Sequence, residues 1–136
     1  MSFVQKNSFS KILLVEDEEA IAKPLTRLLR MSEYDVNWAT DGQQALEILQ
    51  IHPDTKLMLV DIMMPVMNGW QFREAHKNMK SPLNEIPVIF LSADSQSASK
   101  AKEMHECFVS KPIDLDHLKF LMKELINKSD KGSKSI

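Results

Sequence analysis

Four apolar segments of this chain are each followed directly by a polar side chain of the kind that binds metal ions or phosphoryl groups. Residues 11–15 lead into Glu16 and Asp17, residues 57–60 into Asp61, residues 86–91 into Ser92, and residues 107–110 into Lys111. Each segment has the length and apolar character of a buried β-strand. If these strands are parallel neighbours, their carboxyl ends meet at one edge of a sheet, where ligands of open α/β sheets bind.

Three carboxylates at such an edge, from Glu16, Asp17 and Asp61, require a cation, because two unit charges about 4 Å apart repel by about 4 kcal/mol at an effective dielectric of about 20. Oxygen ligands with free space around them suit Mg²⁺, which keeps several of its waters. A carboxylate can accept a phosphoryl group, and catalysis of that transfer is mainly positioning and charge neutralisation. We therefore predict a magnesium-dependent phosphoryl acceptor at Asp61, with Lys111 and Ser92 contacting the phosphoryl oxygens.

Each of these residues also has an ordinary explanation when it is taken alone. Acidic residues after a strand commonly form the solvated first turn of a helix, where the helix dipole favours them. Asp61 or Ser92 alone could cap a helix, and Lys111 alone could be a surface lysine. The same position at the ends of four strands favours one shared site over four coincidences.

Helical patterns separate the strands. A further strand is indicated at residues 34–39, and apolar residues recur at helical spacing between the strands. The expected helices bury Ile21, Leu25, Leu28 and Leu29, then Ala45, Leu46, Ile48 and Leu49, and then span residues 68–79, 95–105 and 114–127. Five strands alternating with five helices predict one α/β domain with a doubly wound five-stranded parallel sheet and right-handed crossovers.

Two of these helices are expected to be irregular. Pro24 would remove an internal hydrogen bond from the first, which predicts a late start or a kink. The helix at 95–105 has only Ala98, Ala101 and Met104 to bury, so we expect it to be the least firmly packed element. The four histidines lack the spacing of metal ligands and are interpreted as surface or helix residues: His52, His76, His105 and His117.

Composition limits the classes of protein. The 136 residues suit one domain, and a net charge of −2 gives no reason to expect a nucleic-acid or membrane partner. The single cysteine, Cys107, cannot form an internal disulfide, which fits a reducing cytosol. No apolar run approaches the roughly 18 residues of a membrane span. We expect a cytoplasmic domain at residues 11–127, with a flexible leader at 1–10 and a flexible basic tail at 128–136.

Taken together, five motifs resemble the receiver domain of bacterial two-component response regulators over about residues 10–127. They are, in the order of that family, LLVEDE, ATDGQQAL, LVDIMMPVMNG, VIFLSA and FVSKP. The resemblance implies a flavodoxin-like sheet of strand order 2-1-3-4-5, as in the single-domain chemotaxis regulators. It also implies that Asp61 is the phosphoacceptor, that Asp17 and the Met63 carbonyl bind Mg²⁺ directly, and that Glu16 acts through water.

The resemblance assigns further roles. Ser92 takes the Thr/Ser position of the family, Lys111 takes its lysine position, and the Lys111–Pro112 bond is expected to be cis. Phe108 falls at the aromatic switch position in place of the common Tyr, so it brings no hydroxyl. Glu16 stands where Asp is more usual, and Met63 and Asp94 occupy positions that tune phosphoryl lifetime.

The resemblance also implies partners. The phosphoryl group would come from a histidine kinase or a histidine phosphotransfer protein, and the chain would signal through the fourth helix, fifth strand and fifth helix. Such a domain is no enzyme with a separate substrate, although it assists its own phosphotransfer and slow autodephosphorylation. Only nine residues follow 127, so we expect output by contact with a downstream protein. Monomer and phosphorylation-dependent dimer both stay open.

Several other assignments stay open as well. The chain could be a stand-alone regulator, a relay intermediate or a receiver module excised from a hybrid histidine kinase. A small Mg²⁺-dependent phosphohydrolase with an aspartyl nucleophile is a rival, but Met63 stands where such enzymes place a second acid. A flavin-binding domain is a weaker rival, because no loop rich in Ser, Thr and Gly follows the first strand.

Overall fold

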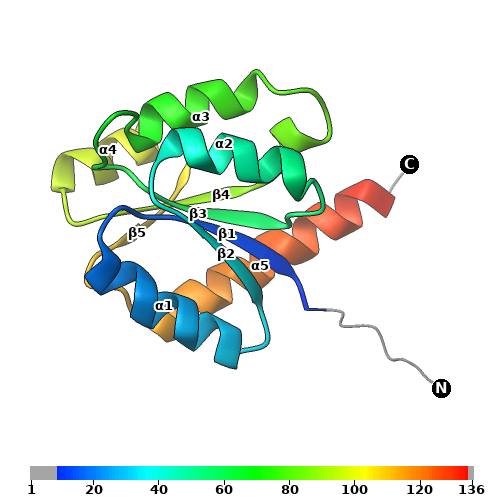
Figure 1. Cartoon of the computed structure of the whole chain (residues 1–136), viewed down its shortest axis with the longest axis horizontal. Coiled ribbons are helices and arrows are strands. Elements are labelled where there is room, and N and C mark those ends of the chain that lie inside the picture. Colours follow the sequence, from blue (N-terminus) through cyan, green and yellow to red (C-terminus); the bar gives the residue numbers. More distant parts are fainter. Residues whose placement is uncertain (1–8, 135–136) are drawn as a thin grey trace.

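The computed structural model describes residues 9–134, and their side chains as far as residue 130. One five-stranded parallel sheet has the order β2-β1-β3-β4-β5, and five α-helices and one 3₁₀ helix connect or follow its strands (Figure 1). The elements are β1 (Lys11–Val15), α1 (Glu19–Met31), β2 (Asp35–Ala39), α2 (Gly42–Ile51), β3 (Leu57–Asp61), α3 (Gly69–Lys77), η1 (Leu83–Glu85), β4 (Val88–Ser92), α4 (Ser95–Glu103), β5 (Cys107–Ser110) and α5 (Leu115–Lys134). The predicted fold class, with its strand order and five α-helices, is therefore confirmed.

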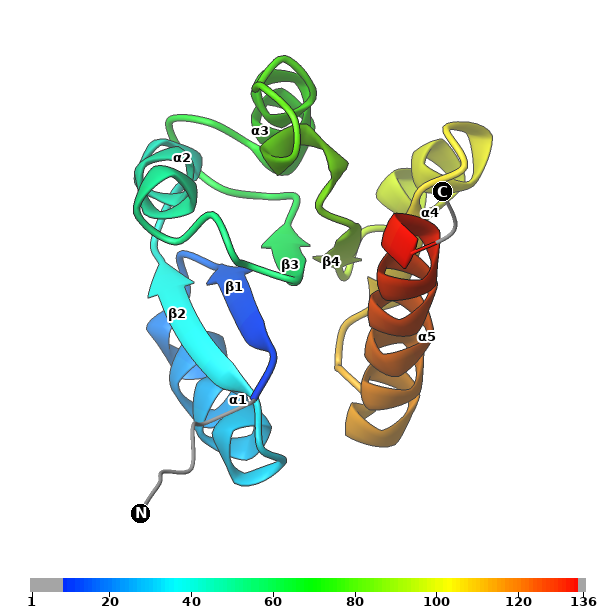
Figure 2. The same ribbon diagram turned by 90° about the vertical axis from the view of Figure 1, so that its right-hand side faces the viewer.

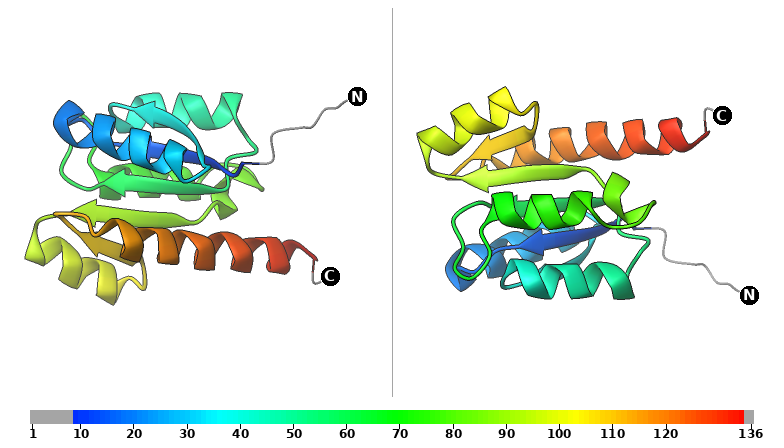
Figure 3. Two further views of the ribbon diagram at one scale, coloured as in Figure 1. Left: turned by 90° about the horizontal axis from the view of Figure 1, so that it is seen from below. Right: turned by 90° about the horizontal axis from the view of Figure 1, so that it is seen from above.

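Helices cover both faces of the sheet. Helices α1 and α5 lie on one face, and α2, α3 and α4 lie on the other (Figures 2 and 3). Side chains alternate between the two faces of a strand, so the two layers bury separate apolar clusters, one containing Leu14, Leu59 and Leu118 and the other Val60 and Phe72. Every residue of β3 and β4 is buried, as expected for parallel strands that are covered on both faces.

The first and last helices differ from the sequence prediction. Helix α1 begins at Glu19 and contains Pro24 in its second turn, so the predicted late start is wrong, and the other alternative, a kink, stays a prediction. Pro24 cannot donate a hydrogen bond, but the apolar face of α1 still buries Leu25 and Leu29, and this packing holds the helix.

Helix α5, expected to end near residue 127, continues to Lys134, so that predicted helix end is wrong, while the flexibility of the tail stays a prediction. No proline interrupts this stretch, and the Lys56 Nζ atom lies 3.3 Å from Asp130 Oδ1, which ties it to the start of β3. Residues 1–8 of the predicted leader, and residues 135–136, lie outside the described part of the chain.

His76, expected at the surface or on a helix, lies on helix α3 as predicted and is fully buried. Two side chains that were expected to be buried are exposed, and the first of them is Leu28 at 41%. Met104, expected to be buried, is 40% exposed, because α4 ends at Glu103 and His105 has a positive φ of 58°. Of the nine residues of α4, only Ser97 and Ala101 are buried.

Within residues 9–134, no helix combines the length and the apolar character that crossing a bilayer needs.

Candidate phosphorylation site

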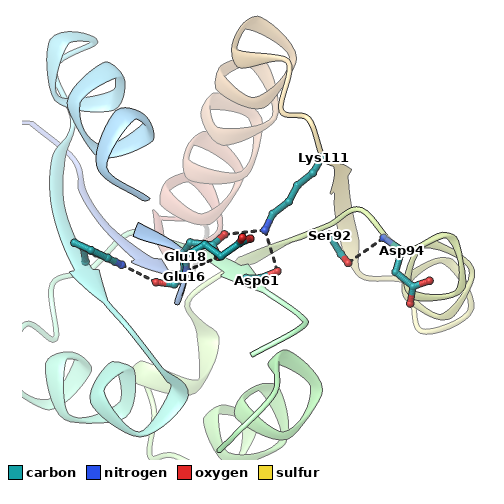
Figure 4. Close-up of polar contacts among 7 residues, drawn as sticks. Glu16, Glu18, Asp61, Ser92, Asp94 and Lys111 are labelled. Carbon is teal, nitrogen blue, oxygen red and sulfur yellow. Dashed lines mark hydrogen bonds and ion pairs between the residues drawn. The ribbon is translucent and has the colours of Figure 1, made fainter. Parts of the chain in front are cut away.

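The chemically active residues of the sequence gather where the sheet presents the carboxyl ends of its strands (Figure 4). Glu16 directly follows β1, and Asp61 is the last residue of β3. Ser92 is the last residue of β4, opposite Ser110 of β5, and Lys111 comes next. The parallel register therefore delivers four separate segments to one place.

Three carboxylates and one ammonium form the centre of the site. Glu16, Asp17 and Asp61 each offer an oxygen atom within 4.8 Å of the others. The Lys111 Nζ atom lies 2.9 Å from Glu16 Oε1 and 3.2 Å from Asp61 Oδ1 (Figure 4). Glu16 is 0% exposed and Asp61 is 3% exposed, so water screens these charges poorly.

Burial sets the ionisation of this cluster. It raises the pKa of Glu16 to about 7, with a further contribution from the Asp61 charge, against the opposing hydrogen bond from Lys111. Burial also raises the pKa of Asp61, although the charge of Lys111 opposes the shift. For Lys111, burial disfavours the ammonium, but the hydrogen bond to Glu16 and the charge of Asp61 raise its pKa overall. Lys111 is therefore a cation, but its single positive charge cannot balance a cluster of three carboxylates.

The cluster fits a hard divalent cation. Its donors are all carboxylate oxygens, which Mg²⁺ prefers, and Asp17 Oδ1 is buried without a protein partner. A buried, unpaired polar atom is costly, and a bound cation would satisfy it. Glu16, Asp17 and Asp61 would hold Mg²⁺ here, while a contribution from the Met63 carbonyl stays a prediction.

A pH-dependent loss of stability is expected when magnesium is absent. Because the pKa of Glu16 is higher in the folded protein (about 7) than its ordinary value of 4.5, the folded state binds more protons between these values, and its stability falls as the pH rises through this range. The loss is about 3 kcal/mol. Urea unfolding at both ends of the range measures it.

Two further measurements test the cause of that loss. Glu16→Gln should remove most of the decline, and saturating Mg²⁺ should flatten it in the wild type, because the ion favours ionised carboxylates. The matched control is Glu19→Gln, since Glu19 is 65% exposed in its pair with Lys23. An equally steep decline in Glu16→Gln would contradict this assignment.

Ser92 lines the same site but faces a different neighbour. Its Oγ atom accepts a hydrogen bond from the Asp94 N–H at 3.2 Å (Figure 4). Asp94 in turn caps α4, accepting from the Gln96 N–H. Ser92, Asp94, Asp61 and Lys111 line one open pocket, so a hydroxyl lies beside the carboxylate and the ammonium.

The remaining predicted residues surround this pocket. Phe108, on β5, is partly buried against the apolar cluster of α3, and the Lys111–Pro112 bond is cis. Sequence reasoning gave no role to Glu18, which also lines the pocket and whose backbone N–H donates to Glu16 Oε2 at 3.2 Å. Its position directly after the Glu16–Asp17 pair was the signal that could have found it.

A glycine fixes the loop that follows Asp61. The Gly69 N–H donates to the Ile62 carbonyl at 2.8 Å, and a Cβ atom on Gly69 would lie 2.8 Å from both the Asp61 carbonyl oxygen and Ile62 Cα. Asn68 caps α3 with a capping box that includes Gln71. The close approach of two backbones therefore requires glycine at the start of α3.

Gly69→Ala is expected to lower the unfolding free energy by about 1–3 kcal/mol and to weaken Mg²⁺ binding, because the new methyl group would displace the backbone of Asp61. Gly42→Ala is the matched control, since Gly42 also begins a helix and the three atoms nearest to its Cβ would all belong to the Met67 side chain. That side chain can rotate, so the control should be close to neutral. Equal effects of the two variants in urea unfolding and Mg²⁺ titration would contradict the explanation.

Comparison with known proteins identifies the family. The model of the response regulator receiver domain matches residues 12–123. The chain belongs to this family. Receiver domains are the phosphoryl-accepting modules of two-component signalling systems, and they generally bind Mg²⁺ in an acidic pocket.

Individual relatives agree with that assignment. The chain is 33% identical over 118 residues to the transcriptional regulatory protein YbdJ of Bacillus subtilis, covering 85% of this chain and 50% of YbdJ. It is 36% identical over 125 residues to hybrid signal transduction histidine kinase M of Dictyostelium discoideum, covering 88% of this chain and 5% of the kinase. This receiver domain therefore spans half or less of both relatives.

Solved structures agree as well. The structure of the chemotaxis protein CheY4 of Vibrio cholerae matches with a TM-score of 0.77 at 25% identity, covering 87% of this chain and 99% of that one.

Proposed function

We propose that this receiver domain accepts a phosphoryl group on Asp61 from a phosphohistidine of a histidine kinase or a histidine phosphotransfer protein. A carboxylate oxygen of Asp61 attacks the phosphorus atom, the P–N bond breaks, and its electron pair stays on the leaving imidazole nitrogen. The product is a mixed anhydride, an aspartyl phosphate. The observation that supports this best is the Lys111 ammonium, which lies within hydrogen-bonding distance of Asp61 at the open pocket.

The protein groups around Asp61 have complementary roles. The Lys111 ammonium, freed from Asp61 as the new bond forms, stabilises the oxygens of the incoming group. The Ser92 hydroxyl turns from the Asp94 N–H to donate to a phosphoryl oxygen. Mg²⁺, held by Glu16, Asp17 and Asp61, supplies further charge neutralisation when bound.

An apolar groove next to the pocket suits the donor protein. Ile21, Pro24 and Leu28 of α1 line it together with Ile113 and Leu115. The groove and the phosphorylation pocket share Glu18, Ala93 and Lys111 among their lining residues. A donor that packs an apolar surface in this groove would bring its phosphohistidine close to Asp61.

Phosphorylation would shift the protein between two packings. When Ser92 turns toward the phosphoryl group, Phe108 follows into the space beside β4, and the face of α4, β5 and α5 is remodelled. This face carries two exposed apolar side chains, Met104 at 40% and Phe120 at 60%, which suits contact with a downstream protein.

The chain could act as a stand-alone regulator or as the receiver module of a longer hybrid kinase, and the 36% identity to hybrid kinase M favours the second. Both alternatives use the same chemistry at Asp61. A related question is whether the phosphoryl group stays on Asp61 or is passed on. Return of the label from Asp61 to a phosphotransfer histidine would favour a relay, and its absence would favour an end-point regulator.

Beryllofluoride with Mg²⁺, which imitates a phosphoryl group on a carboxylate, tests the proposed function. Trp70 follows the Asp61 loop and packs against Phe90, with ring centroids 4.7 Å apart, so its fluorescence should change on binding. The Trp38→Phe variant isolates this signal, because the chain has only two tryptophans. A wild-type protein that binds no beryllofluoride by calorimetry, with Mg²⁺ present, would overturn the proposal.

A further inference from the structure

A partly buried ion pair lies away from the phosphorylation pocket, between α3 and the turn that joins α4 to β5. Arg73 donates from Nε to Glu106 Oε2 at 2.9 Å and from Nη2 to Glu106 Oε1 at 3.2 Å. The two side chains are only 17% and 8% exposed. A bidentate pair of this kind is both strong and geometrically selective, unlike exposed surface pairs, which contribute little.

His76 holds the other side of the Arg73 guanidinium. Arg73 Nη1 lies 2.8 Å from His76 Nδ1, and His76 Nε2 lies 2.8 Å from the Leu83 carbonyl oxygen. A carbonyl only accepts, so Nε2 carries the proton and Nδ1 accepts from Arg73. Burial lowers the pKa of His76, and its ring stacks on Phe72. A neutral, immobile imidazole therefore orients Arg73.

The ion pair is important because α4, the helix that leads into this turn, buries few side chains. Among its residues only Ser97 and Ala101 are buried. Lys100 Nζ lies 4.9 Å from the centre of the Trp70 ring, a cation–π contact between α4 and α3. Polar contacts to α3 thus hold both α4 and the turn behind it.

The turn held by Arg73 leads directly to the switch residue. Glu106 precedes β5, and Phe108 lies two residues further on, opposite Phe90 of β4. A shift of Phe108 beside β4 would also move the start of β5. Apolar contacts tolerate a small displacement, whereas a bidentate ion pair does not, so the pair would have different energies in the two packings.

We infer that Arg73 and Glu106 form a latch that holds the α4–β5 turn, and with it Phe108, in the unphosphorylated packing. The two are positioning residues for the switch, since neither contacts the phosphorylation pocket. This inference rests on the proposed function, because it assumes that a phosphoryl group on Asp61 shifts the packing. Opening the latch favours the activated packing and tightens the binding of ligands that select it.

Calorimetric titration of beryllofluoride with Mg²⁺ tests the latch. Arg73→Gln and Glu106→Gln should each lower its Kd about fivefold or more. The double variant should add little to Glu106→Gln, which already removes the contacts of Glu106 with Arg73 and with Lys77, whose Nζ lies 3.8 Å from Glu106 Oε2. The matched control is Glu19→Gln, which breaks the 65% exposed pair with Lys23 and should leave the Kd unchanged. If Arg73→Gln does not fold, Arg73→Lys replaces it in the titration, because a lysine keeps the positive charge but cannot form the bidentate pair.

Each result decides the question. Variants that are less stable in urea but bind beryllofluoride with the wild-type Kd would show that the pair only supports the fold, and the inference would be wrong. Weaker binding would overturn it too, since the pair would then favour the activated packing. A wild type that binds no beryllofluoride contradicts the proposed function instead, so the two failures are distinguishable.

Discussion

Asp61→Asn is expected to fold and to lose phosphorylation by a small phosphoryl donor by more than about a thousandfold, as is usual when a nucleophile is removed. An amide has no anionic oxygen with which to attack phosphorus. The fold should survive, because the amide oxygen can still accept from Lys111, which lies 3.2 Å from Asp61 Oδ1. Stability at neutral pH without Mg²⁺ should rise, since burial disfavours the Asp61 carboxylate.

Intact mass before and after hydroxylamine treatment measures the effect, because hydroxylamine cleaves acyl phosphates and spares phosphoserine. The control is Asp54→Asn, since Asp54 is 67% exposed and pairs with Lys11 away from the pocket; it should be labelled like the wild type. Hydroxylamine-labile phosphate on Asp61→Asn would mean that another carboxylate is the acceptor.

The position of the site could be predicted because it depends on few geometric choices. Once the strands are parallel, Glu16, Asp61 and Lys111 must meet at one edge, whatever the details of the helices. Each of these residues also directly follows or ends an apolar segment, so its position can be recognised from a few neighbouring residues of the sequence. The alternation of strands and helices predicted a doubly wound parallel sheet, whereas the strand order was implied only by the resemblance to the receiver family.

The latch could not be predicted, because its partners are distant in the sequence. Arg73 and Glu106 are 33 positions apart, and no local pattern links them. Arg73 and His76, three residues apart on a helix, resemble any solvated face. Only the fold shows that the α4–β5 turn lies over this part of α3 and removes both side chains from water.

The ends of two helices were missed for a different reason. Propensity argues against Pro24 inside α1 and for an early end of α5, but tertiary contacts outweigh both. Leu25 and Leu29 bury the face of α1, and Asp130 of α5 pairs with Lys56 at the start of β3. Such contacts join segments that a linear reading treats separately.

Lys111→Gln is expected to change two properties in opposite directions. Its rate of phosphorylation should fall about 10²–10³-fold, the usual cost of losing a preorganised charge at a developing oxyanion. Its affinity for Mg²⁺ should rise about tenfold, equivalent to 1.4 kcal/mol. Lys111 Nζ lies 2.9 and 3.2 Å from two of the three carboxylates of the cluster, so it competes with any divalent ion held there.

Mg²⁺ titration by calorimetry and the rate of mass increase with a small phosphoryl donor measure the two effects on one protein. Lys56→Gln is the control, because Lys56 precedes Leu57 at the opposite end of β3 and is 48% exposed in its pair with Asp130. Both properties should match the wild type there. A general loss of folding would lower affinity and rate together, so opposite changes are specific to a cation that stabilises the phosphoryl oxygens and repels the metal. Weaker Mg²⁺ binding by Lys111→Gln would contradict this explanation, and would mean that Lys111 holds the carboxylates in the positions that bind the ion.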